Sequence, residues 1–342
     1  RRMKHFKTRA KALIMAVVML AMTIVPQTVV QAAPNEVPMA SLGIDVSRYQ
    51  GLINWDMVAA SGVQFAMVRV GYRTQGTGVL NEDTYARHNL QEANRVGIKT
   101  GAYFFSTAVN AQEAMEEALF TANLLDKYKI TFPVAYDCEG FKNATSRQYI
   151  LGKDIRTALA VIFLDTIAAR GYTPMFYSSR NDMEGSSYWD MNILNKYKVW
   201  AAWYPAEPFP ITPACTYTGV HAMWQYTHQA ALPGIAGTVD MNVAYFGYDG
   251  IAEPKDPSGA PHIDMAAAAM VQYTDVSEVV TPNTADLNLR TVPSTASPDT
   301  IVVPINPGDM ILRTGIGNNG WSRVVLGDQV LYAYTAYLDK VM

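Results

Sequence analysis

Two acidic residues stand two positions apart at the end of a short apolar segment, TFPVAYDCEGF, which spans residues 131–141. Apolar and small residues fill this segment up to Gly140, a pattern typical of a β-strand that is covered on both faces. Side chains two apart on a strand share a face, so Asp137 and Glu139 project together, with Cα atoms about 6.6 Å apart. Such a pair can divide the work of an acid and a base. A three-residue motif is more often solvated or salt-bridged than catalytic, so its meaning depends on the rest of the chain.

Apolar segments with the length of strands alternate with helical patterns around this motif. Strands are expected at 42–46, 65–70, 99–105, 132–138, 174–178, 199–204, 221–226 and 236–240. Helices are expected at 83–96, 111–128 and 153–170; a glycine follows the first and the last, and Asn110 precedes the second with Glu113 in capping-box spacing. The third helix is expected to bury one stripe: Ile155, Leu159, Ile162, Phe163 and Ile167. This alternation predicts an α/β fold with a parallel sheet, and eight strands predict an irregular, TIM-like β/α barrel.

Acidic residues also end the first and the last expected strands. Asp45 closes the first strand and Asp240 the last. The active site of a β/α barrel lies at the carboxyl ends of its strands, and closure places the first strand beside the last and opposite the fourth. We therefore expect Asp45, Asp137, Glu139 and Asp240 to converge. A single acid at a strand end can merely accept backbone hydrogen bonds, but four of them favour catalysis.

Aromatic residues share these strand ends, and flat rings beside carboxylates suit a sugar. Glycoside hydrolysis needs a carboxylic acid with a raised pKa to protonate the leaving oxygen, and a carboxylate that stabilises or attacks the anomeric centre. Clustered like charges provide that raised pKa. The candidate substrate-binding residues are Tyr49, Tyr103, Tyr177, Trp203, Trp224 and Gln225.

Other chemistries have little support in the sequence. The histidines His88, His221, His228 and His262 lack the spacing of metal-binding motifs, and no phosphate-binding or dinucleotide-binding motif is present. We therefore expect no metal and no cofactor. The two cysteines, Cys138 and Cys215, are too few for a disulfide scaffold, and the sequence leaves open whether they pair.

The beginning of the chain is typical of a secretory signal peptide, expected over residues 1–33. Six basic residues precede an uncharged run at 12–25, and the small residues Ala32 and Ala33 mark the expected cleavage site. An uncleaved membrane anchor is the alternative, but the run is shorter than the roughly 20 residues that a span needs. Cleavage leaves 21 basic and 30 acidic residues, a net charge of −9. So acidic a protein has no electrostatic reason to bind nucleic acid.

The remaining length favours two domains. We expect a barrel at 34–249, a proline-punctuated linker at 250–270 and a small all-β barrel at 271–342. Within the last part, short β patterns occur at 287–290, 300–305, 310–314, 322–326 and 330–334.

Five motifs together resemble the glycoside hydrolase family 25 lysozymes. They are GIDVS with YQG and INW (43–55), GAYF (101–104), YDCE (136–139), WQY (224–226) and VDMN (239–242). The resemblance implies an irregular β/α barrel that cleaves the β-1,4 bond between N-acetylmuramic acid and N-acetylglucosamine in peptidoglycan. By position it makes Glu139 the general acid, with Asp137, Asp45 and Asp240 as companions. Retaining, inverting and substrate-assisted mechanisms all stay open.

The tail resembles bacterial Src-homology-three-like domains, through LNLR (287–290), GWSRV (320–324) and AYL (336–338). Such domains are commonly wall-binding modules, which implies a device for holding an acidic enzyme on an anionic wall. The resulting expectation is a secreted or wall-associated monomer that acts on peptidoglycan, binds no nucleic acid and is not inserted in a membrane after signal cleavage. The alternatives are a non-catalytic wall-binding protein and a chitin-type N-acetylglucosaminidase.

Overall fold

The computed structural model describes residues 40–245, 253–256, 271–295 and 298–341. The expected signal segment, residues 1–33, lies outside the described residues, and so does most of the expected linker at 250–270. Among the described residues, no helix is both long enough and apolar enough to cross a bilayer.

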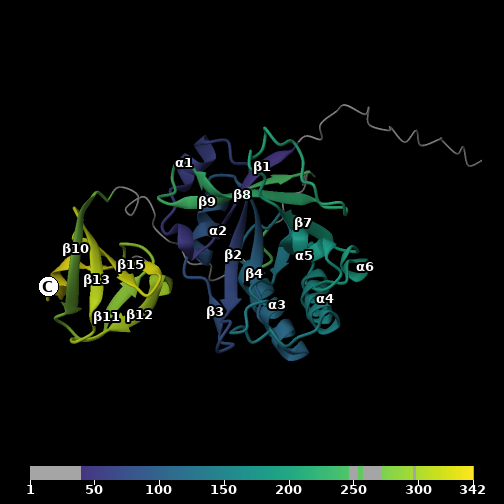
Figure 1. Cartoon of the computed structure of the whole chain (residues 1–342). Coiled ribbons are helices and arrows are strands. Elements are labelled where there is room, and N and C mark those ends of the chain that lie inside the picture. Colours follow the sequence, from purple (N-terminus) through teal and green to yellow (C-terminus); the bar gives the residue numbers. More distant parts are fainter. Residues whose placement is uncertain (1–39, 246–252, 257–270, 296–297, 342) are drawn as a thin grey trace, which may run out of the picture. The chain divides into compact units, whose positions relative to one another are not determined.

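Eight strands close into a barrel in the first part of the chain, which confirms the predicted α/β architecture (Figure 1). The ring order is β1-β9-β8-β7-β6-β5-β4-β2, closed by pairing of β1 with β2, and a short strand β3 extends β2 at its edge. All eight expected strands of the barrel are present, and the short strand β3 was not expected. The strands are β1 (Ser41–Val46), β2 (Phe65–Arg73), β3 (Leu80–Glu82), β4 (Lys99–Phe105), β5 (Val134–Asp137), β6 (Pro174–Ser179), β7 (Lys198–Ala202), β8 (Met223–Ala231) and β9 (Thr238–Ala244).

The last strand differs from the expected parallel arrangement. Strand β9 runs antiparallel to both of its neighbours, β1 and β8. The expectation that Asp240 ends its strand is therefore wrong, because Asp240 is the third residue of β9. Since the strand is reversed, its beginning lies at the end of the barrel where β1 finishes, and Asp240 pairs directly with Asp45.

Helices cover the outside of the barrel and bury its outward-facing side chains. They are α1 (Trp55–Ala60), α2 (Ala86–Arg95), α3 (Ala111–Leu125), α4 (Lys153–Ala169), α5 (Arg180–Glu184) and α6 (Met191–Leu194), with a 3₁₀ turn at Arg48–Gln50. The Asn110 side chain caps α3 by accepting from the Glu113 amide at 2.9 Å. The expected stripe on α4 is wrong at one position: Ile155 is 53% exposed, whereas Leu159, Phe163 and Ile167 are buried.

Inward-facing side chains fill the barrel below its mouth. Strand alternation sends one set of residues outward to the helices and the other set inward. The inward set includes Phe65, Met67, Met175, Trp200 and Met223, all buried. This apolar layer fills the interior of the barrel. The inward-facing polar side chains beyond it therefore lie at the open end.

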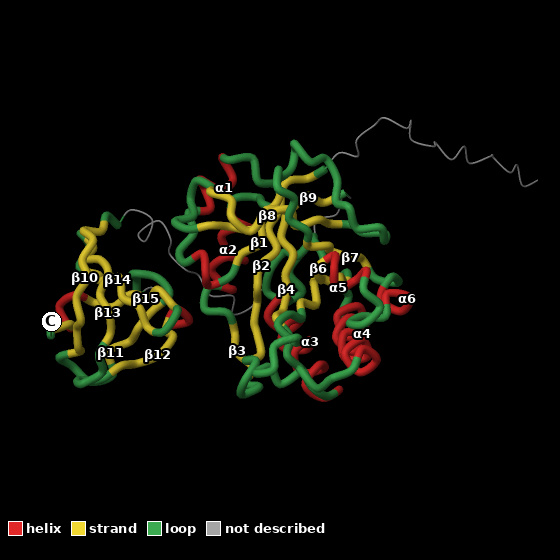
Figure 2. Tube along the Cα trace, viewed as in Figure 1, coloured by secondary structure: helices red, strands yellow, loops and turns green. Residues whose placement is uncertain are grey.

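The last described part of the chain is all-β, apart from two 3₁₀ turns, at Pro298–Thr300 and Thr335–Tyr337 (Figure 2). Its sheet order is β12-β11-β15-β14-β13-β10-β16, with antiparallel pairing throughout. A core of its own includes Val280, Leu289, Val324 and Leu331. Five strands coincide with expected segments, while β10 and β16 were not separately expected. The strands are β10 (Tyr273–Pro282), β11 (Leu287–Arg290), β12 (Ile301–Ile305), β13 (Ile311–Gly317), β14 (Trp321–Leu326), β15 (Gln329–Tyr334) and β16 (Leu338–Lys340).

Candidate active site

Polar side chains line a cleft of about 350 Å³ at the open end of the barrel. All four predicted acids reach it, from three different strands. Four of the six predicted substrate-binding residues, Tyr49, Tyr103, Tyr177 and Gln225, line it as well. The other lining residues are Ser47, Gln50, Arg69, Phe105, Trp200 and His228.

Strand β5 delivers the first pair of acids. Asp137, its last residue, is buried, whereas Glu139 lies just beyond the strand and is exposed at the mouth. Burial, followed by the nearby charge of Glu139, raises the pKa of Asp137 well above its ordinary range. The cleft walls also remove water from Glu139, which raises its pKa. Because two neighbouring carboxylates repel each other, one carboxyl of the pair keeps its proton to a higher pH than an isolated carboxyl would.

The second pair joins β1 to β9, through Asp45 and Asp240. Gln225 lies between them and donates its amide to Asp45 Oδ2 at 2.9 Å and to Asp240 Oδ2 at 3.2 Å. Asn242 also donates to Asp45 Oδ2, at 2.8 Å. Burial, followed by the charge of Asp45, raises the pKa of Asp240 to about 8. Burial raises the pKa of Asp45 too, against the lowering effect of the bonds from Asn242 and Gln225.

Gln225 is held in place by two tyrosines. Its Oε1 accepts from the hydroxyl of Tyr177 at 2.9 Å and from that of Tyr204 at 2.5 Å. Because both tyrosine hydroxyls donate to Oε1, the Nε2 end of the Gln225 amide faces the acids. Asn242 is oriented in the same way, because its Oδ1 accepts from the Trp200 indole at 2.9 Å. The acids of the second pair are thus held by side chains whose own orientation is fixed.

Arg69 brings a positive charge into the cleft, and sequence reasoning missed it. It projects inward from β2 and donates Nε to the buried Asp83 at 2.8 Å. Its charge lowers the pKa of Asp137, against the larger effect of burial. Alternation along the expected strand 65–70 places Arg69 on the same face as Met67 and could have indicated it.

Tyrosines form the walls of the cleft. Tyr103 packs edge-on against Trp200, with ring centroids 6.2 Å apart. Tyr49 stands on the rim, 61% exposed, with the guanidinium groups of Arg48 and Arg69 over its ring at 5.2 and 5.0 Å. Cations over the ring of Tyr49 help to hold it in place on the rim of the cleft.

The two predicted tryptophans lie elsewhere. Trp224 is fully buried, and its indole donates to the Trp203 carbonyl at 2.7 Å. The expectation that Trp224 contacts substrate is therefore wrong, because β8 turns Gln225 inward and its neighbour Trp224 outward. Trp203 stacks on Trp224 at 5.8 Å and lines a second cavity of about 520 Å³.

This second cavity adjoins the cleft, because Glu139 and Tyr177 line both. Its other walls come from the segments after β5, β6 and β7, and they include Lys142, Arg180 and Asp182. Lys142 is paired with Asp182 at 2.7 Å. Glu139 thus stands between two adjoining hollows.

The cysteines do not pair in this structure, where both are free thiols. Cys138 is buried on the opposite face of β5 from the acids, and burial raises its pKa to about 12. Within the described residues, no group of three or more His, Cys, Asp or Glu side chains is arranged to hold a metal ion.

Comparison with known proteins finds relatives of the barrel. The chain is 29% identical over 211 residues to the uncharacterized protein YegX of Escherichia coli K12, covering 59% of this chain and 68% of YegX. It is 27% identical over 206 residues to lysozyme M1 of Streptomyces globisporus, covering 58% and 66%.

A solved structure shows the same fold. The modular autolysin LytC from Streptococcus pneumoniae, in complex with a synthetic peptidoglycan ligand, aligns with a TM-score of 0.50 and 28% identity. The alignment covers 60% of this chain but only 46% of LytC, so the likeness concerns the barrel. The model of the family "Glycosyl hydrolases family 25" matches residues 44–235, which is more than half of the chain. The matched part includes Asp45, Asp137 and Glu139. On this match and the geometry of its cleft, the chain belongs to glycosyl hydrolases family 25 and is a glycoside hydrolase.

Proposed function

We propose that this protein cleaves the β-1,4 bond between N-acetylmuramic acid and N-acetylglucosamine in peptidoglycan. The observation that carries the proposal is the coupled acid pair on β5, with Glu139 exposed between two adjoining hollows and Asp137 buried behind it. The lysozyme M1 relative and the peptidoglycan complex of LytC support the choice of substrate.

Glu139 gives its proton to the glycosidic oxygen as the bond to the anomeric carbon breaks. Its raised pKa keeps that proton available, and the exposed position lets the carboxyl reach the bond. The acetamido oxygen of the sugar that carries this anomeric carbon attacks it. The Asp137 carboxylate, whose ionised form is favoured by the charge of Arg69, accepts the acetamido N–H. Asp137 Oδ1 is buried and has no hydrogen-bond partner among the described residues, which suits that acceptor role. Water then opens the intermediate and returns a proton to Glu139.

Export and wall attachment complete the proposal. Residues 1–33 act as a signal peptide, and the β-strand part, 271–342, holds the enzyme on the wall. The support is the charge pattern of the first segment and the separate core of the last one. The enzyme works as a secreted, wall-associated monomer.

The test uses purified peptidoglycan and the substitution Glu139→Gln. We expect the natural protein to release new muramic-acid reducing ends, with retained anomeric configuration in a fast NMR time course. The variant should keep its fold and lose at least about 100-fold in rate, the usual size of acid catalysis. Undiminished turnover by Glu139→Gln would rule out this assignment. Faster cleavage of chitin oligomers than of peptidoglycan would move the substrate to N-acetylglucosamine chains.

A further inference from the structure

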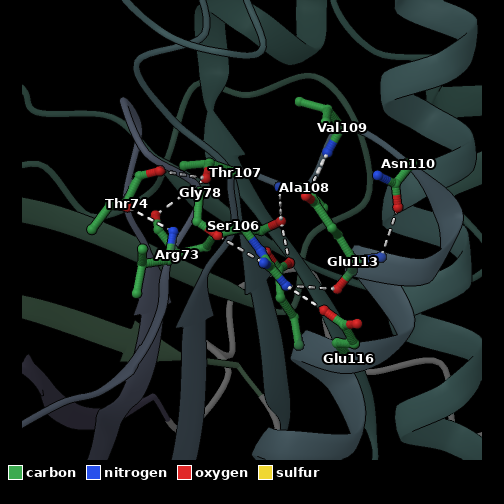
Figure 3. Close-up of polar contacts among 12 residues, drawn as sticks. Arg73, Thr74, Gly78, Ser106, Thr107, Ala108, Val109, Asn110, Glu113 and Glu116 are labelled. Atoms are coloured by element: carbon green, nitrogen blue, oxygen red, sulfur yellow. Dashed lines mark hydrogen bonds and ion pairs between the residues drawn. The ribbon is translucent and has the colours of Figure 1, made fainter.

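An ion-pair network lies outside the barrel, behind the β5 acids. Its members, which we call the outer network, are Arg73 on β2, Glu113 and Glu117 on α3, and Arg147 in the segment before α4. Figure 3 shows part of it, with Arg73 reaching toward Gly78 and Glu116, and Ser106 beside it. Glu117 is fully buried; its Oε1 accepts from Arg73 Nε at 2.7 Å and its Oε2 from the Ser106 hydroxyl at 2.5 Å. Burial raises the pKa of Glu117 to about 7.

A second ion pair is joined to the first, because Arg73 Nη2 donates to the Glu113 carbonyl at 3.3 Å. Arg147 forms two bonds with Glu113, at 2.8 and 2.9 Å, in a fork-to-fork arrangement. The pair is half-buried, with side chains 21% and 17% exposed. Glu113 also accepts from the Val109 amide at 2.9 Å, so α3, the loop before it and the segment around Arg147 are tied together.

Each of three consecutive residues at the end of β5 and just beyond it is held by a contact from this region. The Asp137 carbonyl accepts from the Ser106 amide at 2.7 Å. The Cys138 thiol lies 3.3 Å from Gln148 Oε1. The Glu139 carbonyl accepts from Gln75 Nε2 at 2.9 Å. We call Ser106, Gln148 and Gln75 the three anchors.

All three anchors are connected to the outer network. Ser106 is bonded to Glu117, and Gln148 directly follows Arg147 in the chain. The Gln75 carbonyl accepts from the Arg147 amide at 3.0 Å. Gln148 is held from a second side, since its Nε2 donates to the Ala108 carbonyl at 2.9 Å. Displacement of Arg147 would therefore release two anchors, one of them on Glu139 itself.

We propose that Arg147, through its fork with Glu113, is a positioning residue that holds Glu139 at the distance from Asp137 and from the glycosidic bond that proton transfer requires. The inference rests on the proposed role of Glu139 as the acid. Misplacement of a reacting group by about 1 Å, caused by a change outside the site, can cost 100-fold in rate. No atom of the network lines the cleft, so substrate binding should change little.

The experiment compares Arg147→Gln with Arg170→Gln in the full chain. Arg170 forms a similar half-buried pair with Asp126, with side chains 31% and 18% exposed, and it also links α4 to α3, at the C-terminal ends of these helices. Both variants should lower the melting temperature by comparable amounts. We expect kcat on peptidoglycan to fall about 10- to 100-fold in Arg147→Gln, with KM within about twofold, and to stay unchanged in Arg170→Gln.

A second readout does not need turnover. A ¹³C-carboxyl NMR titration should show the higher pKa of the Asp137–Glu139 pair falling in Arg147→Gln, because separated carboxylates repel less, and remaining the same in Arg170→Gln. If Arg147→Gln does not fold, Gln75→Ala removes only the anchor on Glu139 and should lower kcat in the same way.

An unchanged kcat and an unchanged titration in folded Arg147→Gln and Gln75→Ala would overturn the inference, while Glu139→Gln still lost activity. If instead Glu139→Gln stayed active, the proposed function would fail, and the titration alone would decide whether Arg147 positions the pair.

Discussion

At the scale of single residues, the cleft contains two pairs of acids with raised pKa values. The Asp137–Glu139 pair lies where the reaction needs a proton. The Asp45–Asp240 pair, bridged by Gln225, lies on the strands opposite. Since Gln225 donates to both acids of the second pair, its amide fixes their positions relative to each other.

The raised pKa of Asp240 predicts how stability depends on pH. Asp240 has an ordinary pKa of 3.8 in the unfolded chain and about 8 in the folded one. Between these values the folded state binds more protons than the unfolded state, so the free energy of unfolding falls as pH rises from about 4 to about 8. We expect Asp240→Asn to flatten that fall, measured as melting temperature in a series of buffers at constant ionic strength. An identical slope in the variant and the natural protein would contradict the raised pKa.

At the scale of elements, the turn after β5 decides where Glu139 points. Gly140 has a φ of +72°, and a Cβ at this position would lie 2.1 Å from Gln75 Nε2. Gly97, which follows α2, has a similar φ of +79° but open space around it. The two glycines thus share a backbone conformation and differ in what a side chain would displace.

This difference predicts a separation of stability from activity. Gly140→Ala and Gly97→Ala should each destabilise the protein by about 1–2 kcal/mol, the cost of a left-handed conformation for alanine. Only Gly140→Ala should also reduce kcat, because its Cβ pushes the Gln75 amide away from the Glu139 carbonyl. Urea denaturation and initial rates on peptidoglycan measure the two effects. Equal rates in both variants would show that the turn does not set the position of Glu139.

Local patterns predicted the strands and the acids, because alternation along a short strand specifies both its existence and its inward face. The eight barrel strands and the carboxylates on them follow from that rule. The direction of β9 could not be predicted, since an apolar strand reads the same in either direction. Alternation along β8 makes Trp224 face outward when Gln225 faces inward. The residue type alone could not indicate this, because an aromatic residue at a strand end can belong to the core as readily as to a binding site. The anchors depend on loops that meet only in three dimensions.

At the scale of the whole molecule, the barrel and the last β-strand part each have a core of their own. From these two cores we propose that the two parts can fold independently. We therefore expect a chain that ends after residue 256 to keep its barrel fold and its turnover of soluble muropeptide chains. Most of the truncated protein should no longer sediment with purified cell walls. Sedimentation and turnover measured on the same preparations test this, and undiminished pelleting would remove the wall-binding role from the tail.

The reversed direction of β9 has a further consequence for how the chain leaves the barrel. In an all-parallel barrel the last strand ends at the catalytic mouth, and a helix must carry the chain away from it. Here Ala244 pairs with Ser41, the first residue of β1, so the strand itself returns the chain to the closed end. An attachment point on the side away from the cleft can accept a longer, shorter or different appendage without rebuilding the mouth. A single antiparallel strand thus separates the end of the barrel's chain from the residues that line the cleft.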